Sequence, residues 1–460
     1  MSSLFAPIQN LVKHAFCLMG ENEPPLPSRA DLARAKQAIL ARHVEQLHQP
    51  RLLCALALGN ESEDRKSSSI EETKSKSMKD LVGIGVLATT MREMAVLLSQ
   101  WTGECGLQVE QAKAAYAASA FIHSAVELST TAETSPEEIH WPITRLALMQ
   151  STAMYLRNLD RVKLAIAASD EGASEALKES QKGIGELARS WGLEFMVLCD
   201  LVDDHPLSHW YWDGPFCGAF YPSFPTFSSS TPFILLAFKG TTPTNVGEWL
   251  VDLDFAAAVP AASAGEGEGV CFGAPVSKGV SQALFEPYDI AKKKVPFDLI
   301  IEGLRDLACA LGGGIRNPVP VYVTGHSLGA SYATLFYAEA LRRPPNKEPF
   351  VLVDLHTFGA PRVGLSQFGL SLCSLVASRN VHTWRIANTG DLVTSVPPVV
   401  NDAGQEFEHM DCGLRVEKGK PSMKLESELG KGAEACARGG VIDHACERYW
   451  EALGSAAGRG

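Results

Sequence analysis

The chain has 460 residues, of which 46% are hydrophobic and 20% are charged, as in ordinary globular proteins long enough for two or three structural units. A formal net charge of -12 argues against a nucleic-acid-binding surface and against simple electrostatic attraction to anionic membranes. The 11 cysteines are scattered without a C-x-x-C pair, which predicts reduced thiols of an intracellular protein, with neither a disulfide framework nor a metal site.

We expect no signal peptide and no transmembrane segment. The apolar stretch from Leu11 to Met19 is interrupted by Lys13 and His14, and no small-residue cleavage site follows it. No run reaches the about 18 uninterrupted apolar residues of a membrane span. The sequence therefore predicts a cytoplasmic or otherwise intracellular protein, peripheral on lipid surfaces if it meets them.

Residues 1–200 are predicted to form a mostly helical N-terminal region. Ser28 followed by Asp31 resembles the capped start of a helix. Ser135 followed by Pro136 resembles the start of a later helix, which Pro142 restarts. Apolar spacing predicts helices over residues 28–47, 81–101, 109–128, 135–162 and 174–198. The polar residues 60–79 predict a disordered loop between the first two helices.

Residues 201–460 have a different pattern, in which short apolar runs alternate with helical stretches. Buried strands are predicted over residues 232–238, 319–324, 350–357 and 381–387, and helices over 296–311 and 330–342. Such alternation favours an α/β domain with a mainly parallel sheet covered on both faces. Residues 256–269, rich in Ala and Gly, predict an irregular insertion.

A candidate nucleophile lies between a predicted strand and a predicted helix, in Gly325-His326-Ser327-Leu328-Gly329. A G-x-S-x-G motif in this context is typical of the strained strand-to-helix turn that exposes a reactive serine in α/β-hydrolases. The glycines leave room for close packing, and the helix N-terminus favours developing negative charge. The sequence therefore predicts Ser327 as the nucleophile of an acyl-transfer enzyme.

A serine nucleophile needs a histidine base, which in this fold follows the acid along the chain. His356 and His382 lie within apolar strand patterns and are interpreted as structural. His444 lies near the C-terminus, after a glycine-rich loop and before a helix, where a late loop would deliver a base to the sheet. We therefore expect His444 to be the base, with His409 as the alternative.

The acid is expected at the carboxyl end of a strand, because active-site groups of such sheets gather there. Asp391 follows the strand predicted over residues 381–387, whereas Asp354 lies inside a strand and Asp402 lies further along a loop. The oxyanion hole needs two backbone N–H groups, one after the nucleophile and one after an earlier strand. These positions correspond to Leu328 and Thr241.

Four segments resemble the fungal-type (class 3) lipases of the α/β-hydrolase superfamily. They are AFKGTTPTNVGEWLVDLDF, VYVTGHSLGASYATL, HTFGAPRVG and RIANTGDLVTSVPP, and IDHACERYW resembles the closing D-H-x-x-Y segment with its tyrosine two positions late. The resemblance covers about residues 200–450. It differs at residues 276–280, where many members have V-H-x-G-F, and in the insertion close to the expected lid.

The resemblance implies Ser327 as nucleophile, Asp391 as acid, His444 as base, and Thr241 and Leu328 as oxyanion donors. It places His409 at a structural position of the family. It also implies a lid at Thr242 to Leu250, with Trp249 facing either the acyl pocket or the core.

The resemblance further implies a lipase of lipid metabolism that needs neither metal nor organic cofactor. Acylglycerols are the leading substrates, and phospholipids or other carboxylic esters are the alternative for the same chemistry. A transacylase that excludes water is another reading. A catalytically silent scaffold, with a helical N-terminal region that binds a partner, is the alternative outside enzymes.

Overall fold

The structure is a computed structural model. It describes residues 29–47, 139–168, 170–204, 211–222, 232–241, 256–260, 269–287, 295–344, 347–397, 405–410, 413–425 and 441–456. The loop expected at residues 60–79 and the helices expected at 81–101 and 109–128 lie outside these ranges, as do Asp402, Trp249 and the rest of the expected lid.

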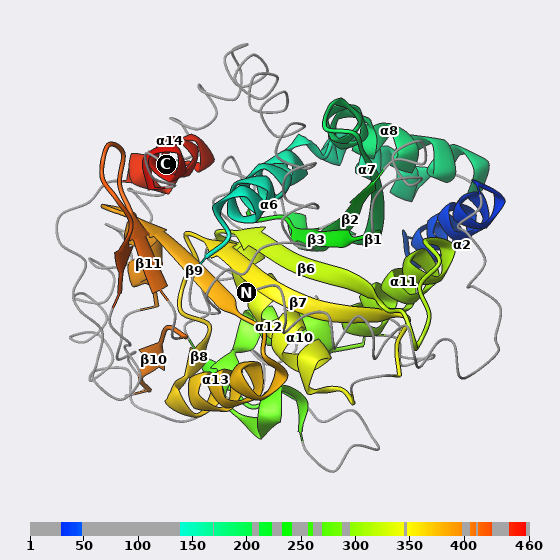
Figure 1. The fold of residues 1–460 in the computed structure, drawn as a ribbon. Helices are drawn as coiled ribbons and strands as arrows, with labels where there is room; N and C mark the ends of the chain where they lie inside the picture. Colours follow the sequence, from blue (N-terminus) through cyan, green and yellow to red (C-terminus); the bar gives the residue numbers. More distant parts are fainter. Residues whose placement is uncertain are drawn as a thin grey trace, which may run out of the picture.

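The described residues contain an eight-stranded sheet with the order β1-β2-β3-β6-β7-β9-β11-β12 (Figure 1). Its strands are β1 (Leu193–Asp204), β2 (Tyr211–Pro222), β3 (Ile234–Phe238), β6 (Val319–His326), β7 (Phe350–Phe358), β9 (Thr383–Asn388), β11 (Gly413–Val416) and β12 (Met423–Lys424). The strands from β3 to β11 pair in parallel, and antiparallel pairs flank them on both sides.

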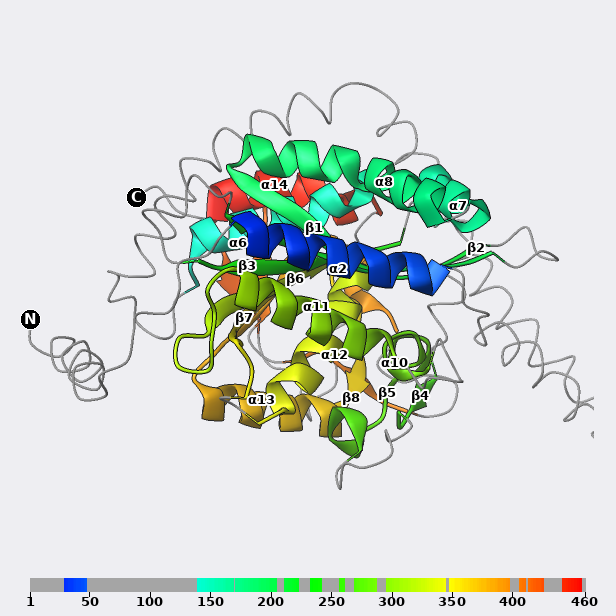
Figure 2. The same cartoon turned by 90° about the vertical axis from the view of Figure 1, so that its right-hand side faces the viewer.

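Helices cover both faces of this sheet, as Figure 2 shows. On one face lie α6 (Trp141–Ala153), α7 (Leu159–Ala167), α8 (Asp170–Ser190) and α14 (Cys446–Ala456). On the other lie α10 (Lys278–Phe285), α11 (Pro296–Ala310), α12 (Leu328–Arg342) and α13 (Ser366–Arg379), with α2 (Arg29–Leu47) packed against β1 and α11. The described residues thus form the three-layer α/β arrangement that the sequence predicts.

The strand β3 shows how one sheet serves two cores. Ile234, Leu236 and Phe238 join the core beneath α10 to α13, and the alternate residues Leu235 and Ala237 join the core beneath α6, α8 and α14. Successive side chains of a strand point to opposite faces, and here both faces are covered by helices. This explains why the strand reads as an uninterrupted apolar run.

Two predicted helices differ from the structure. The helix expected over residues 135–162 is two helices, because a short 3-10 turn, η1 (Met154–Leu156), ends α6 and Asn158 caps the start of α7. The helix expected over residues 174–198 ends at Ser190, and β1 then begins at Leu193. The sheet therefore begins before residue 200, within the region predicted to be helical.

A smaller four-stranded sheet, in the order β10-β8-β5-β4, lies beside α13 (Figure 1). It consists of two-residue strands: β4 (Ala257–Ala258), β5 (Val276–Ser277), β8 (Gly364–Leu365) and β10 (Phe407–Glu408). Its strand β4 lies in the insertion expected at residues 256–269, and β5 lies in the segment 276–280 that departs from the family pattern. Among the described helices, none is both long enough and apolar enough to cross a membrane.

Candidate active site

Ser327 lies on a strained turn between β6 and α12. Its backbone angles are φ 59° and ψ -132°, and a positive φ in a residue other than glycine costs about 1–3 kcal/mol. A Cβ on Gly325 would lie 2.2 Å from the Gly329 carbonyl oxygen, and one on Gly329 would lie 2.4 Å from the Phe238 carbonyl oxygen. Only glycine fits at these two positions, so the motif is required by the packing of the turn.

The Ser327 side chain is buried at the start of α12, with 2% of the residue exposed. Its backbone N–H donates to the Phe358 carbonyl at 2.9 Å, which ties the turn to the end of β7. Its Oγ accepts and donates no hydrogen bond within the described part of the chain. A buried serine hydroxyl of this kind is available to a substrate, and the helix N-terminus beside it favours negative charge.

Asp391 and His444 meet although 53 residues separate them in the sequence. The His444 Nδ1–H donates to Asp391 Oδ2 at 2.9 Å, and both residues are buried. Asp391 follows β9 and caps the short helix η4 (Leu392–Ser395), whereas His444 ends η5 (Val441–His444). The bond directs Nδ1 toward the carboxylate and leaves Nε2, also buried, at the opposite side of the ring.

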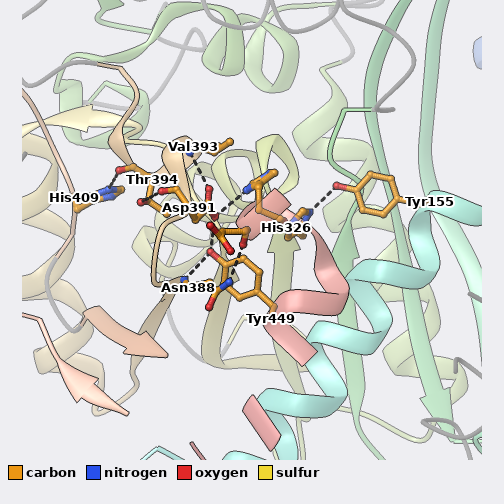
Figure 3. A network of polar contacts seen from close by, with 10 residues as sticks. Tyr155, His326, Asn388, Asp391, Val393, Thr394, His409 and Tyr449 are labelled. Atoms are coloured by element: carbon orange, nitrogen blue, oxygen red, sulfur yellow. Dashed lines mark hydrogen bonds and ion pairs between the residues drawn. The ribbon is translucent and has the colours of Figure 1, made fainter. Parts of the chain in front are cut away.

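The Asp391 carboxylate accepts two further hydrogen bonds (Figure 3). Tyr449 O–H donates to Oδ2 at 2.6 Å, and the Val393 N–H donates to Oδ1 at 2.8 Å. Burial opposes ionisation of the carboxyl, but these donors together with His444 outweigh it and hold its pKa below the ordinary value. Asp391 is therefore held as a carboxylate, the form that orients and stabilises a charged imidazole.

Two residues around this pair were not predicted from the sequence. Gly359 has φ +58°, and a Cβ there would lie 2.7 Å from His444 Cε1 and 2.9 Å from Asp391 Oδ2. Tyr155, from η1, has its hydroxyl 2.8 Å from His326 Nδ1. The first had a signal in its family-like segment HTFGAPRVG, but the contact of Tyr155 with the elbow had none.

The alternative base, His409, has a different position. Its Nε2–H donates to the Thr394 carbonyl at 2.7 Å on the far side of η4, as Figure 3 shows. Burial, with Arg385 and Arg362 nearby, lowers the pKa of His409 well below its ordinary value. A neutral histidine bound to a main-chain carbonyl fits a structural role.

His356 and His382, the two histidines interpreted as structural, contact residues outside the Asp391–His444 pair. His382 Nδ1 is 3.3 Å from Asp354 Oδ1, and His356 Nδ1 is 3.2 Å from Thr144 Oγ1. Burial lowers the pKa of His356 to about 4, so it is neutral at physiological pH. Asp354 is thus engaged by His382, apart from the Asp391–His444 pair.

The two expected oxyanion donors come from segments that pack tightly together. Phe238 pairs with Gly325 in the parallel ladder of β3 and β6, and a Cβ on Gly329 would lie 2.8 Å from the Gly240 nitrogen. Thr241 directly follows Gly240 and is buried, and Leu328 begins α12. The packing thus places the chain segments of both donors at the elbow, while their role stays a prediction.

The titratable residues that the structure describes form no metal site. In the part of the chain that the structure describes, no group of three or more His, Cys, Asp or Glu side chains has the arrangement of metal ligands. The described cysteines form no disulfide with one another, and Cys199, Cys217 and Cys271 are buried.

Comparison with known proteins shows similarity to lipases and phospholipases. The chain is 36% identical over 103 residues to phospholipase A(1) DAD1, chloroplastic, of Arabidopsis thaliana, which is 22% of this chain and 21% of that protein. It is 29% identical over 179 residues to phospholipase A1-II 7 of Oryza sativa subsp. indica, which is 36% of this chain and 41% of that protein. The matches thus span less than half of either relative.

Two solved structures are similar at low identity. A Rhizomucor miehei lipase propeptide complex is 17% identical with a TM-score of 0.42, and the match covers 68% of this chain and 79% of that chain. The mono- and diacylglycerol lipase from Aspergillus oryzae is 17% identical with a TM-score of 0.41, and the match covers 69% and 99%.

Residues 235–401 match the family described as lipase (class 3). This range contains the end of β3 with its following loop, the Ser327 elbow and Asp391, and it ends before His444. The region of this chain that carries the serine elbow and Asp391 is therefore similar to the class 3 lipases.

Proposed function

We propose that this protein is a serine carboxyl-ester hydrolase that cleaves fatty-acyl esters of glycerolipids through an acyl-serine intermediate. The observation that carries the proposal is the buried 2.9 Å hydrogen bond from His444 to Asp391, next to a serine on a strained turn. A Cβ on Gly359 would collide with both members of the pair, and its neighbour Phe358 accepts the Ser327 N–H. The serine, histidine and carboxylate are thus linked by adjacent residues of one strand end.

In the proposed reaction, His444 Nε2 takes the Ser327 proton as Oγ attacks the ester carbonyl. Asp391 stabilises the resulting imidazolium, and the N–H groups of Thr241 and Leu328 bind the oxyanion. The imidazolium then protonates the leaving alcohol, and an acyl-serine remains. Water activated by His444 releases the fatty acid and restores the enzyme.

The substrate class rests on the family and its relatives. Lipases of class 3 and the two plant phospholipases A1 support a glycerolipid ester, and we take acylglycerols as the leading substrate with phospholipids as the alternative. An intracellular location, expected from cysteines that are scattered without a C-x-x-C pair, fits either lipid. Contact with a lipid surface would then be transient and peripheral.

The test compares hydrolysis by the wild-type protein and by Ser327→Ala. Emulsified triacylglycerol, phosphatidylcholine vesicles and p-nitrophenyl esters of short and long chains serve as substrates, with released acid measured by titration. We expect wild-type turnover on at least one lipid and loss of turnover in the variant. Equal trace rates in both proteins on all substrates would refute the enzyme function, and turnover of short esters alone would refute the lipid substrate class.

A further inference from the structure

We propose that Tyr155 is a positioning residue for the base His444 and acts on it through His326, an inference that rests on the proposed esterase function. Tyr155 lies in η1, outside the segment that matches the lipase family, so the proposal assigns a part of the site to the N-terminal region. Figure 3 shows its hydroxyl directed at the His326 ring, on the side away from Asp391.

The two hydrogen bonds of His326 determine where its proton lies. Nε2 is 2.9 Å from the His444 carbonyl oxygen, which can only accept, so Nε2 must carry the hydrogen. Nδ1 is then the acceptor, and the Tyr155 O–H at 2.8 Å is its donor. Both nitrogens of the ring are engaged, and the tautomer is set from both sides.

This arrangement keeps His326 neutral beside the base. Burial, with the neighbouring His444 adding to it, lowers the pKa of His326 to about 3. The rings of His326 and His444 lie with their centroids 4.5 Å apart. Since His444 gains a positive charge as it takes the Ser327 proton, a second charge on His326 would oppose the transition state.

Other groups around His326 are consistent with this role. The Tyr449 ring meets it edge-on at 5.9 Å, and the Asp391 carboxylate lies beyond His444. Burial raises the pKa of the Tyr155 hydroxyl well above its ordinary value and raises the pKa of the Cys446 thiol of α14 to about 12, so both groups are uncharged. Asp391, on the far side of His444, is thus the negatively charged member of this set.

The main chain of His444 is held by the same contact. The His326 Nε2–H binds the carbonyl of His444, so a shift of the His326 ring moves the segment that carries the base. Gly240 makes room for the tyrosine, because a Cβ there would lie 2.3 Å from the Tyr155 hydroxyl. Tyr155 therefore contacts the elbow and the expected oxyanion loop together.

A buried ion pair anchors the segment that carries Tyr155. Two residues on, Arg157 binds Asp200 of β1 at 2.5 Å, and both side chains are almost fully buried. The Arg157 guanidinium also lies 4.7 Å from the centre of the Phe216 ring in β2. The Phe216 carbonyl accepts the Lys239 N–H at 2.9 Å, so η1 and the loop before Thr241 are tied to the same strand.

The test is Tyr155→Phe, with Tyr337→Phe as the matched control. Both changes delete a tyrosine hydroxyl that makes a hydrogen bond, but the Tyr337 hydroxyl donates to the Val353 carbonyl and does not contact the elbow. We expect kcat of Tyr155→Phe to fall about ten-fold with KM within about two-fold, because the base is misplaced while the substrate pocket is kept. The control should keep kcat within about two-fold of wild type.

Two further readouts separate positioning from general damage. The loss of kcat in Tyr155→Phe should grow toward acidic pH, because removal of the donor to Nδ1 raises the pKa of His326 and lets it charge beside His444. Nitrogen-15 NMR of histidine-labelled protein should show His326 as the Nε2–H tautomer in the wild type and a changed signal in Tyr155→Phe alone.

The outcomes for the two proposals are distinct. A wild-type protein that neither hydrolyses esters nor reacts with a fluorophosphonate at Ser327 refutes the proposed function. An active wild type in which Tyr155→Phe keeps its kcat, or in which His326 carries its hydrogen on Nδ1, refutes the positioning role alone. If Tyr155→Phe folds poorly, the wild-type tautomer still decides.

Discussion

Replacement of Gly359 by Ala should displace the His444–Asp391 pair, because the added Cβ would collide with both side chains. The new Cβ would lie 2.7 Å from His444 Cε1, 2.8 Å from His444 Nδ1 and 2.9 Å from Asp391 Oδ2. Carbon atoms pack at about 3.5–4.0 Å, so the imidazole must retreat by about 0.8–1.3 Å. Displacement of a catalytic group by about 1 Å can cost about 100-fold in rate, and we expect that loss in kcat/KM.

The same substitution also strains the backbone, and a second variant isolates this cost. Gly359 has φ +58°, and an L-residue in that region costs about 1–2 kcal/mol. Gly419 has φ +81°, but a Cβ there meets no atom of the described residues within 4 Å. Gly419→Ala should therefore lose similar stability to urea while it keeps its activity.

The assay is p-nitrophenyl ester hydrolysis together with urea denaturation of wild type, Gly359→Ala and Gly419→Ala. Loss of activity in Gly359→Ala alone would locate the damage at the His444–Asp391 pair. If Gly359→Ala retained kcat/KM within about three-fold of wild type, activity would not depend on the position that His444 has in the structure.

Three further predictions follow from other contacts. His444→Ala should lose nearly as much kcat as Ser327→Ala, because triad members act as a unit, whereas His409→Ala should keep most activity. Steady-state rates in which His409→Ala is the more damaged variant would overturn the assignment of the base. Tyr449→Phe should destabilise the protein by about 1.5–3 kcal/mol at pH 7 in urea, because a hydrogen bond to a buried carboxylate is lost. The hydrogen bond from Tyr449 helps to hold the pKa of Asp391 below its ordinary value of 3.8. The stabilisation that the bond gives is therefore complete above that pH and is lost as the pH falls through the folded-state pKa of Asp391. A difference in unfolding free energy between wild type and Tyr449→Phe that does not shrink in acid would contradict this. Arg157→Met should lower the free energy of unfolding by about 3–5 kcal/mol, because it leaves Asp200 buried without its cation. The double variant Arg157→Met/Asp200→Leu should recover most of this stability. Equal melting temperatures for wild type and Arg157→Met would argue against a stabilising ion pair.

The strands at the centre of the sheet could be predicted because both of their faces are buried. The strands β3, β6, β7 and β9 read as continuous apolar runs between turn residues, and each lies where the sequence predicts it, within about two residues. The flanking strand β1 could not be distinguished from the helix before it, since its apolar residues continue the pattern of α8. Pairing with β2, a tertiary contact, determines its conformation.

In the candidate site too, features that depend on local sequence could be predicted, whereas contacts between distant segments could not. Ser327 is predictable because its motif is a local backbone requirement, and Asp391 because it follows a recognisable strand. Tyr155 lies 171 residues from His326, and no local pattern indicates that contact. Tyr449 lies two positions later than the family pattern expects, yet its hydroxyl reaches Asp391 because α14 begins only after η5.

Attack of Ser327 on the ester carbonyl can be tested by covalent trapping of the serine. The wild-type protein is incubated with a long-chain alkyl fluorophosphonate, digested, and sequenced by mass spectrometry, with Ser327→Ala as the control. The proposed mechanism predicts a single adduct on the peptide that contains Ser327 and none in the variant. An adduct on a different residue, or an unmodified Ser327 in protein that hydrolyses esters, would contradict it.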